Sequence, residues 1–336
     1  MHWISNNNII ILVKTLAMKQ NIITFGLTLL LINAIIMVGC NNNPHIVKHN
    51  GEKDLISFKS IKGISYTEIN RRQKNGLSFN EDGYQLEPQW KVNFVSDDSV
   101  CIYSFIKKRF LNFPLSRGYD SVFNTARTWL KVKKMSKDSL VLEILKAQND
   151  TVDITGAGIY MTFYADNYVK NVLRSDTTTL RHASRKDSLF IKSLVIKANT
   201  DIKKAFAARQ PVAFISKSPS IKVEKWKAKG DLLNNFDSSD DYLYPTFTII
   251  INKAYTNFYY SFSVYVDEKG QMHYGEPLIA FLGEGIRKSY IHESQAVMNS
   301  YLKYYLQVIP GKTLNMPHTS LINIHVEGKA DALAMR

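Results

Sequence analysis

The feature that most constrains the fold of this 336-residue chain is a stretch of alternating residues in its C-terminal third. Residues 260, 262, 264 and 266 are apolar, and Ser261, Ser263 and Tyr265 lie between them. A period of two predicts a strand with one buried face. Asp267-Glu268-Lys269-Gly270 then predicts a hairpin turn, because Gly270 can adopt the positive φ that such loops need. A return strand is expected over residues 271–281.

The periodicity changes after residue 285. Ile291, Met298, Leu302 and Tyr305 recur at helical spacing. Ser289 is the expected N-cap, so that His292 and Glu293 fall in the first turn, and Pro310-Gly311 is expected to end the helix. A last strand is expected over residues 321–326, with Ile322, Ile324 and Val326 on one face and Asn323 and His325 on the other. The predicted order is strand, strand, helix, strand, which defines an α+β domain.

Two motifs in this region resemble the C-terminal domain of TonB-type proteins. Such domains carry a P-G-K-x-x-x-x-P stretch before their final strand, which matches Pro310, Gly311, Lys312 and Pro317 here. They also carry a V-D-x-x-G hairpin upstream, which matches residues 266–270. The resemblance covers residues 244–328. It departs from the family pattern where Leu306 replaces an aromatic residue and Met316 replaces a glycine. The alternative is an unrelated α+β domain with the same element order.

Residues 1–39 predict a signal peptide, with Met18 as the expected start. The almost wholly apolar run over residues 22–38 ends in Gly39-Cys40, which resembles the lipobox of bacterial lipoproteins. The resemblance implies that Cys40 is lipidated and becomes the mature N-terminus. Residues 40–55 are then expected to be a tether between bilayer and domain. A buried thiol at Cys40, or an uncleaved anchor helix, remain the alternatives.

Residues 56–215 predict a β-rich domain that resembles no recognised family. Alternating segments, of which the hairpin over residues 128–145 is the clearest, indicate a small antiparallel sheet or a partial barrel. A helix is expected over residues 185–209. Residues 216–243, rich in Asn, Asp and Ser towards their end, are expected to be a linker, and residues 329–336 a tail. The whole chain is therefore expected to be an α+β protein.

Composition and motifs argue against several function classes. The formal charge of +14 favours anionic lipid headgroups or polyanionic glycans, and no nucleic-acid-binding motif occurs. The eight histidines are dispersed without an H-E-x-x-H pair, so surface histidines are expected rather than a metal site. No P-loop or G-x-S-x-G elbow occurs. We therefore expect no catalytic residue, cofactor or metal. The tyrosines at 255, 259, 260 and 265 could stack a sugar ring, although a sheet face explains them more simply.

The sequence therefore predicts a lipid-anchored protein of the cell envelope, on the outer membrane and facing the periplasm. The resemblance to TonB-type domains implies a binding module that takes an extended peptide from a protein partner onto a sheet edge. The final strand, as the last regular element, is expected to be that edge: Leu321, Ile322, Asn323, Ile324, His325 and Val326. The alternative is a carrier of a small or lipid-like ligand in the β-rich domain.

Overall fold

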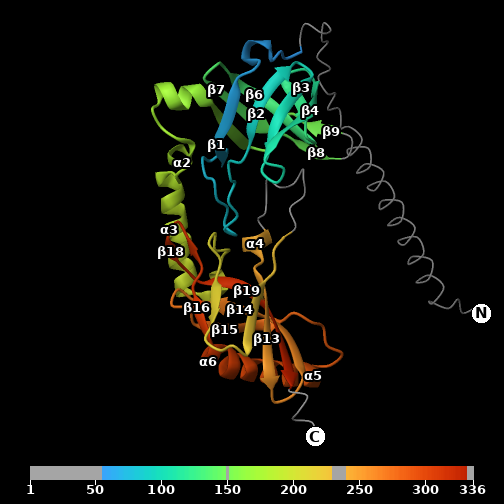
Figure 1. The fold of residues 1–336 in the computed structure, drawn as a ribbon, viewed down its shortest axis with the longest axis vertical. Helices are drawn as coiled ribbons and strands as arrows, with labels where there is room; N and C mark the ends of the chain where they lie inside the picture. The colour runs from blue at the N-terminus through green and yellow to red at the C-terminus, as the bar shows by residue number, and fades with distance from the viewer. Residues whose placement is uncertain (1–54, 149–150, 229–239, 331–336) are drawn as a thin grey trace, which may run out of the picture. The chain divides into compact units, whose positions relative to one another are not determined.

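The computed structural model describes residues 55–148, 151–228 and 240–330 (Figure 1). The expected signal peptide, Cys40 and nearly all of the expected tether lie outside these ranges. All described residues belong to one unit, residues 52–336, when the chain is divided by its contacts.

The β-rich region is a closed antiparallel barrel, so the prediction of a β-rich domain is confirmed and the expected partial barrel is complete. Each strand pairs with the next one along the chain, except that β7 pairs with β10, which closes the barrel onto β1. The strands are β1 (Ser65–Gln73), β2 (Lys91–Ser96), β3 (Ser99–Ser104), β4 (Arg109–Arg117), β5 (Val122–Thr125), β6 (Thr128–Met135), β7 (Ser139–Ile144) and β10 (Ile159–Ala165). The small hairpin of β8 (Lys146–Gln148) and β9 (Thr151–Asp153) lies between β7 and β10 in sequence.

Aromatic side chains fill the core of the barrel. Phe58 stacks on Phe94 with ring centroids 4.4 Å apart, and Phe123 meets Phe58 edge-on at 5.1 Å. All three side chains are at most 2% exposed. The single turn η2 (Lys59–Ile61) follows Phe58, and Ile61 is buried in the same core. Small barrels have interiors just wide enough to be filled in this way.

The expected helix over residues 185–209 is shorter in the structure. After the π-turn η3 (Tyr168–Val172) and α2 (Thr177–Leu180), α3 spans Arg185–Thr200. Asp201 then leaves the helix and caps the turn η4 (Ile202–Lys204), its Oδ1 accepting a hydrogen bond from the Lys203 amide. Residues 205–208 are outside any helix and are largely buried, because Phe206 and Ala208 pack against neighbouring segments. The predicted C-terminal end of this helix was therefore wrong.

Buried polar contacts fix the start of α3. Ser184 and Asp187 form a capping box, in which each side chain accepts from the backbone N–H of the other. The Asp187 carboxylate also accepts from the Ser78 amide at 2.8 Å and pairs with Arg72 at 3.0 Å. Burial by itself would raise the pKa of Asp187, but the hydrogen bonds from Ser184 and Ser78 lower it below its ordinary value. The carboxylate thereby ties the helix to β1 and to the connection that follows it.

The C-terminal region is a five-stranded sheet with the order β12-β13-β19-β14-β15. Its strands are β12 (Ile221–Lys225), β13 (Thr246–Ala254), β14 (Phe258–Val266), β15 (Met272–Pro277) and β19 (Ser320–Ala330). One face packs against α5 (Glu284–Val297), η5 (Met298–Leu302) and α6 (Lys303–Tyr305). The remaining elements are α4 (Asp240–Leu243), the pair β11 (Ala213–Ser216) and β16 (Leu306–Ile309), and the pair β17 (Lys312–Thr313) and β18 (Met316–Pro317).

The final strand β19 is not an edge, so the expected docking edge over residues 321–326 was wrong. It pairs in parallel with β13 over residues 323–330 and antiparallel with β14 over residues 320–328, and Ile324 lies opposite both Phe247 and Phe262. Ile322, Ile324 and Val326 are at most 1% exposed. The helix α5 carries the chain back across the sheet, and the last strand then enters between two earlier ones. Insertion buries its apolar positions more fully than an edge position could.

The helix before β19 starts and ends earlier than expected. Gly283 is the N-cap of α5, so Ser289, His292 and Glu293 lie inside the helix rather than at its start. The first turn contributes no core residue, and its Ile286 is exposed, so apolar periodicity could not reveal it. The helix ends at Tyr305, well before Pro310, because β16 follows at once and pairs with β11.

The expected linker over residues 216–243 contains regular structure. The strand β12 pairs with β13 as part of the sheet, and α4 precedes β13. The alternation in β12 has only two apolar positions, Ile221 and Val223, which is too short a pattern to stand out from the Lys-rich stretch around it. Residues 229–239, the Asn-rich and Asp-rich part of the expected linker, lie outside the described residues. The expected boundary between the β-rich domain and the linker, at residue 215, falls inside β11, and the tail prediction at residue 329 falls inside β19.

Candidate functional site

The second face of the C-terminal sheet, opposite α5, carries three of the six residues of the predicted docking edge. We call it the open face and define it by the β19 residues Leu321, Asn323 and His325 with their cross-strand neighbours. The neighbours on β13 are Thr246 and Thr248, and those on β14 are Ser261, Ser263 and Tyr265. The predicted residues of opposite parity, Ile322, Ile324 and Val326, are buried in the helix-facing core. The predicted alternation of the two faces is therefore correct, although the strand is central.

His325 forms a polar cluster at the middle of the open face. Its Nδ1 lies 2.7 Å from Ser261 Oγ and 3.3 Å from Tyr259 Oη. Its ring is nearly parallel to that of Tyr259, with centroids 6.2 Å apart. Ser261 is 3% exposed, and no carboxylate of the described residues bonds to His325. A nucleophile and its base need an accessible hydroxyl and an orienting third group, so this cluster ties two strands together rather than forming a catalytic pair.

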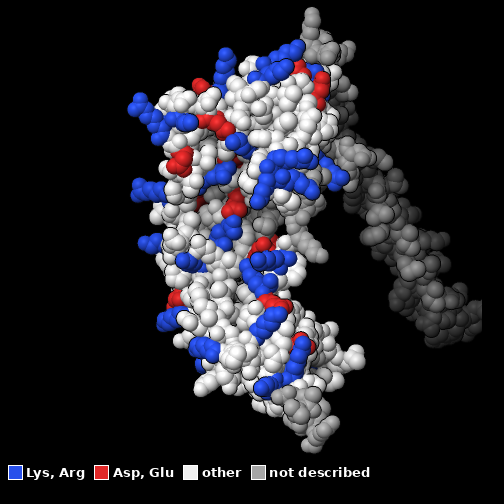
Figure 2. Space-filling view, in the orientation of Figure 1, with Lys and Arg blue, Asp and Glu red and all other residues white. Residues whose placement is uncertain are grey.

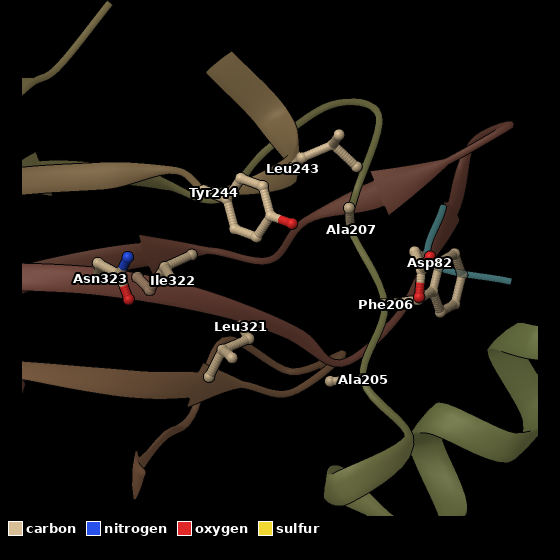
Figure 3. Close-up of a pocket in the computed structure, with 9 residues that line it drawn as sticks. All are labelled: Asp82, Ala205, Phe206, Ala207, Leu243, Tyr244, Leu321, Ile322 and Asn323. Atoms are coloured by element: carbon tan, nitrogen blue, oxygen red, sulfur yellow. The ribbon is translucent and has the colours of Figure 1, made fainter. Parts of the chain in front are cut away.

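The first cavity of the open face lies at the start of β19 (Figure 3) and has a volume of about 260 Å³. We call it the Leu321 pocket. Figure 3 shows Leu243 and Tyr244 on one side, Leu321 across from them, and the segment carrying Ala205 to Ala207 alongside. Its polar groups are those of Asp82, Tyr244 and Asn323. The lining residues are Asp82, Ala205, Phe206, Ala207, Leu243, Tyr244, Leu321, Ile322 and Asn323.

A second cavity, of about 440 Å³, adjoins the first at Tyr244. We call it the Trp226 pocket; it is lined by Trp226, Asp240, Tyr244, Thr246 and His325. Trp226 is 53% exposed and Tyr244 is 69% exposed. Sequence reasoning missed both residues because they fall in or beside the expected linker. Their only signal is that they are two of the four aromatic residues in a stretch rich in Asn, Asp, Ser and Lys.

The residues of the P-G-K motif have a structural role in the described fold. An added Cβ at Gly311 would lie 2.5 Å from the Ala208 Cβ and 2.8 Å from Ser320 Oγ, so the chain approaches too closely for any side chain there. The next residue, Lys312, exchanges two backbone hydrogen bonds with Gln210, of 2.8 and 2.9 Å. Pro317 lies opposite Lys312 in the β17–β18 pair, and Pro310 precedes the close approach. The motif fastens the segment after α3 to the start of β19.

His318, which was expected to be a surface histidine, is fully buried beside this motif. Its Nδ1 lies 3.0 Å from the Thr319 carbonyl oxygen, which can only accept, so Nδ1 carries the hydrogen. Its Nε2 lies 3.0 Å from Thr313 Oγ1, which itself accepts from the Arg209 amide and therefore donates to Nε2. The ring stacks on Phe206 at 3.7 Å. Burial lowers the pKa of His318 to about 4, although the hydrogen bond to Thr319 opposes the shift.

The true edges of the sheet are β15 and β12. The Asp267 amide donates to the Gln271 carbonyl, so by alternation the peptide groups of Met272 and Tyr274 point away from β14. The strand β12, by contrast, carries two exposed charged side chains, Lys222 and Glu224, which form an ion pair. Charged residues of this kind protect an edge from pairing. The edge at β15 is therefore the better candidate for binding another strand.

An exposed apolar segment follows the edge strand β15. Leu278 and Ile279 are close to half exposed, Leu282 is fully exposed, and Ile286 in the first turn of α5 is more than half exposed. We call these four residues the apolar segment. Contiguous exposed apolar residues of this kind are typical of a site that contacts a partner.

The surface charge shows no single basic stripe in the view of Figure 2. Lys and Arg side chains are spread over much of the face drawn, with Asp and Glu between them. Within residues 55–148, 151–228 and 240–330, none of the helices combines the length and apolar character needed to span a bilayer. The same residues contain no group of three or more His, Cys, Asp or Glu side chains that could hold a metal ion.

Comparison with known proteins returned no match, either to a family model or to a curated protein. The resemblances to TonB-type domains and to lipoproteins therefore rest on the quoted motifs alone.

Proposed function

We propose that this protein is a lipid-anchored envelope protein whose C-terminal domain binds an extended peptide of another envelope protein along β15. The observation that carries the proposal is the free edge of β15, with the peptide groups of Met272 and Tyr274 directed outwards and the apolar segment directly after it. The predicted class of function, a protein-binding or peptide-binding module, is kept. The docking strand moves from β19 to β15.

The physics of strand addition fits this edge. Each backbone hydrogen bond from a bound peptide to β15 contributes about 0.5–1.5 kcal/mol net. Apolar side chains of the peptide that cover Leu278, Ile279 or Leu282 add about 25 cal/mol for each Å² of apolar surface removed from water. Backbone pairing supplies affinity, and the apolar segment supplies selectivity for a peptide with apolar residues at matching positions.

The alternative function, a carrier of a small or lipid-like ligand, draws on the closed barrel. Barrels of this size either fill with side chains or hold one small ligand. Here Phe58, Phe94 and Phe123 occupy the core in mutual contact. The geometry of the barrel core therefore gives the carrier function less support than the open edge gives the binding module.

Site-specific photo-cross-linking on the full, lipidated protein in its own envelope tests the docking edge. A photoreactive residue at Glu276, exposed on β15, should cross-link to a partner, whereas one at Lys222, exposed on the β12 edge, should not. Leu282→Ser should lower the yield from position 276. Leu189→Ser, at an apolar position on α3 that is 59% exposed, is the control for the same substitution away from β15 and should leave the yield unchanged. Equal cross-linking from both edges would refute the proposal.

The anchor rests on Gly39-Cys40 at the end of the apolar run over residues 22–38. Cys40→Ala should move the protein out of the detergent-requiring membrane fraction, or leave it as an unprocessed precursor. Several buried acyl methylenes, each contributing about 0.8 kcal/mol, would otherwise hold it on the bilayer. A Cys40→Ala variant that is processed and fractionates like the wild type would disprove lipid anchoring at this residue.

A further inference from the structure

We propose that the Trp226 pocket binds a neutral saccharide, with one pyranose ring held against Trp226 and Tyr244 and the chain continuing into the Leu321 pocket. The site lies on the open face of the sheet and is separate from the β15 edge. It therefore goes beyond the proposed peptide binding, and either of the two can fail without the other.

The first observation is the exposure of two large aromatic side chains around one cavity. Trp226 and Tyr244 both line the 440 Å³ pocket, and both expose more than half of their surface. Aromatic side chains normally bury roughly 150–250 Å² each in a core or an interface. An exposed pair around a cavity is therefore typical of a surface that binds a ligand or a partner. A cavity of this volume lies within the range of small-molecule sites.

The second observation is the set of polar groups in the same cavity. Asp240 contributes a carboxylate, Thr246 a hydroxyl and His325 an imidazole. Because Nδ1 of His325 is engaged by Ser261 and Tyr259, Nε2 is the ring nitrogen left for a ligand. The pocket therefore offers acceptors and donors beside two flat apolar surfaces.

This combination fits one class of ligand. A pyranose ring has an apolar face of C–H groups, which packs on an aromatic ring, and a rim of hydroxyls, which both donate and accept hydrogen bonds. A wholly apolar ligand would cover the Asp240 carboxylate and Nε2 of His325 without giving them a hydrogen bond, which costs free energy. An anionic ligand would face the Asp240 carboxylate. The neutral saccharide satisfies both sets of groups.

The adjoining Leu321 pocket extends the site. Tyr244 lines both cavities, so the two share one wall residue. Beyond it, Asn323 and Asp82 supply further polar groups, and Leu321 and Phe206 supply apolar ones (Figure 3). Both cavities therefore offer polar and apolar groups together, which fits a chain of sugar rings that occupies the two.

Tryptophan fluorescence gives a direct test, because Trp226 is the most exposed of the tryptophans that the structure describes: Trp90 is buried and Trp129 is half-buried. The full protein is kept in a detergent without sugar groups, and acrylamide quenching is measured with increasing tetrasaccharide of β-linked N-acetylglucosamine or of β-linked glucose. A sulfated tetrasaccharide is the anionic comparison. We expect a neutral saccharide to protect Trp226 from acrylamide quenching in a saturable manner. In Trp226→Phe, the quenching of the remaining tryptophans should not change when the saccharide is added.

Matched tyrosine variants locate the binding. Tyr244→Ala should weaken saccharide binding about tenfold, which corresponds to about 1.4 kcal/mol. Tyr255→Ala removes a tyrosine of similar exposure that lines neither pocket, and it should leave the affinity unchanged. The proposal is overturned if neither neutral saccharide protects Trp226, if only the sulfated one does, or if both tyrosine variants weaken binding equally. Cross-linking from β15 serves as the separate readout of peptide binding and should not change in Tyr244→Ala.

Discussion

The barrel and the C-terminal sheet both consist largely of antiparallel strands with alternating side chains, but only the barrel is closed. In the barrel every strand is paired on both sides, because β10 closes onto β1. The sheet stays open, with outer strands at β12 and β15. Closure removes the unpaired peptide groups that could bind another strand. The open sheet keeps them.

The placement of aromatic residues follows the same division. In the barrel, Phe58, Phe94 and Phe123 meet one another in the core. On the open face of the sheet, Trp226 and Tyr244 line cavities and remain more than half exposed. Aromatic side chains that are buried stabilise the fold, while those left exposed around a cavity are available for a ligand. The stabilising aromatic residues therefore lie in the barrel core, and the two proposed binding sites lie on the sheet.

The largest expected effect tests the first half of this comparison. Phe94→Ala removes a ring that contacts both Phe58 and Phe123, and it should lower the free energy of unfolding by about 3–5 kcal/mol, since the cavity adds to the lost burial. Trp226→Ala is the matched control on the open face and should change stability by no more than about 0.5 kcal/mol. Urea unfolding of both variants measures the difference. A loss of similar size in Trp226→Ala would mean that the open-face aromatics are structural.

The next effect tests the central position of β19. Asn323→Pro and Ile324→Pro lie on opposite parities, so at an edge only one of them would break a hydrogen bond of the sheet. In the observed sheet, the two positions face β13 and β14 with both ladders formed. Each variant should therefore lose roughly 3 kcal/mol or more, because each removes a ladder hydrogen bond from a central strand and fixes φ away from the value of a strand. If either variant unfolded at the wild-type temperature, one side of β19 would be free and the original edge prediction would be restored.

Short-range patterns predicted the elements that alternate clearly and bury one face. The hairpin of β14 and β15, the hairpin of β6 and β7 and the apolar parity of β19 all follow from a period of two. The pattern fails where a segment lacks a buried stripe. The first turn of α5 is solvent-exposed, and β12 has only two apolar positions, so neither stands out from a loop.

Position within a sheet could not be predicted, because it depends on which strands meet after the chain returns. The sequence of residues 320–330 does not indicate whether one or both of β13 and β14 will pair with this strand. The same limit applies to the candidate site. Leu321, Asn323 and His325 were selected for the wrong reason, as an edge, while Trp226 and Tyr244 are brought to them from a segment expected to be a linker. Cavities formed by distant segments have no local signature.

The smallest of the three effects concerns the place where the two regions are joined. His318 stacks on Phe206, and Phe206 belongs to a small core with Phe79 from the connection after β1 and with Ile191 from α3. This core therefore links a barrel connection, the long helix and the start of β19. Charging His318 would leave a buried cation without an opposite charge at the junction, since its two hydrogen-bond partners, the Thr313 hydroxyl and the Thr319 carbonyl, are neutral.

The pH dependence of stability should report this burial. Because the pKa of His318 is lowered from 6.5 to about 4 in the folded protein, the unfolded chain binds the proton first as the pH falls. The histidine is neutral in both states above pH 6.5 and costs nothing there; between 6.5 and 4 the folded state loses stability progressively, and below 4 the loss stops growing. With about 1.36 kcal/mol for each pKa unit, the full loss of stability is at most on the order of 3 kcal/mol.

His318→Gln cannot titrate, so the stability difference between wild type and variant, measured by urea unfolding, should shrink as the pH falls from neutral towards 4. A difference that stays constant over this range would show that the imidazole takes up its proton in the folded protein as readily as in the unfolded chain, and that the junction is open to water.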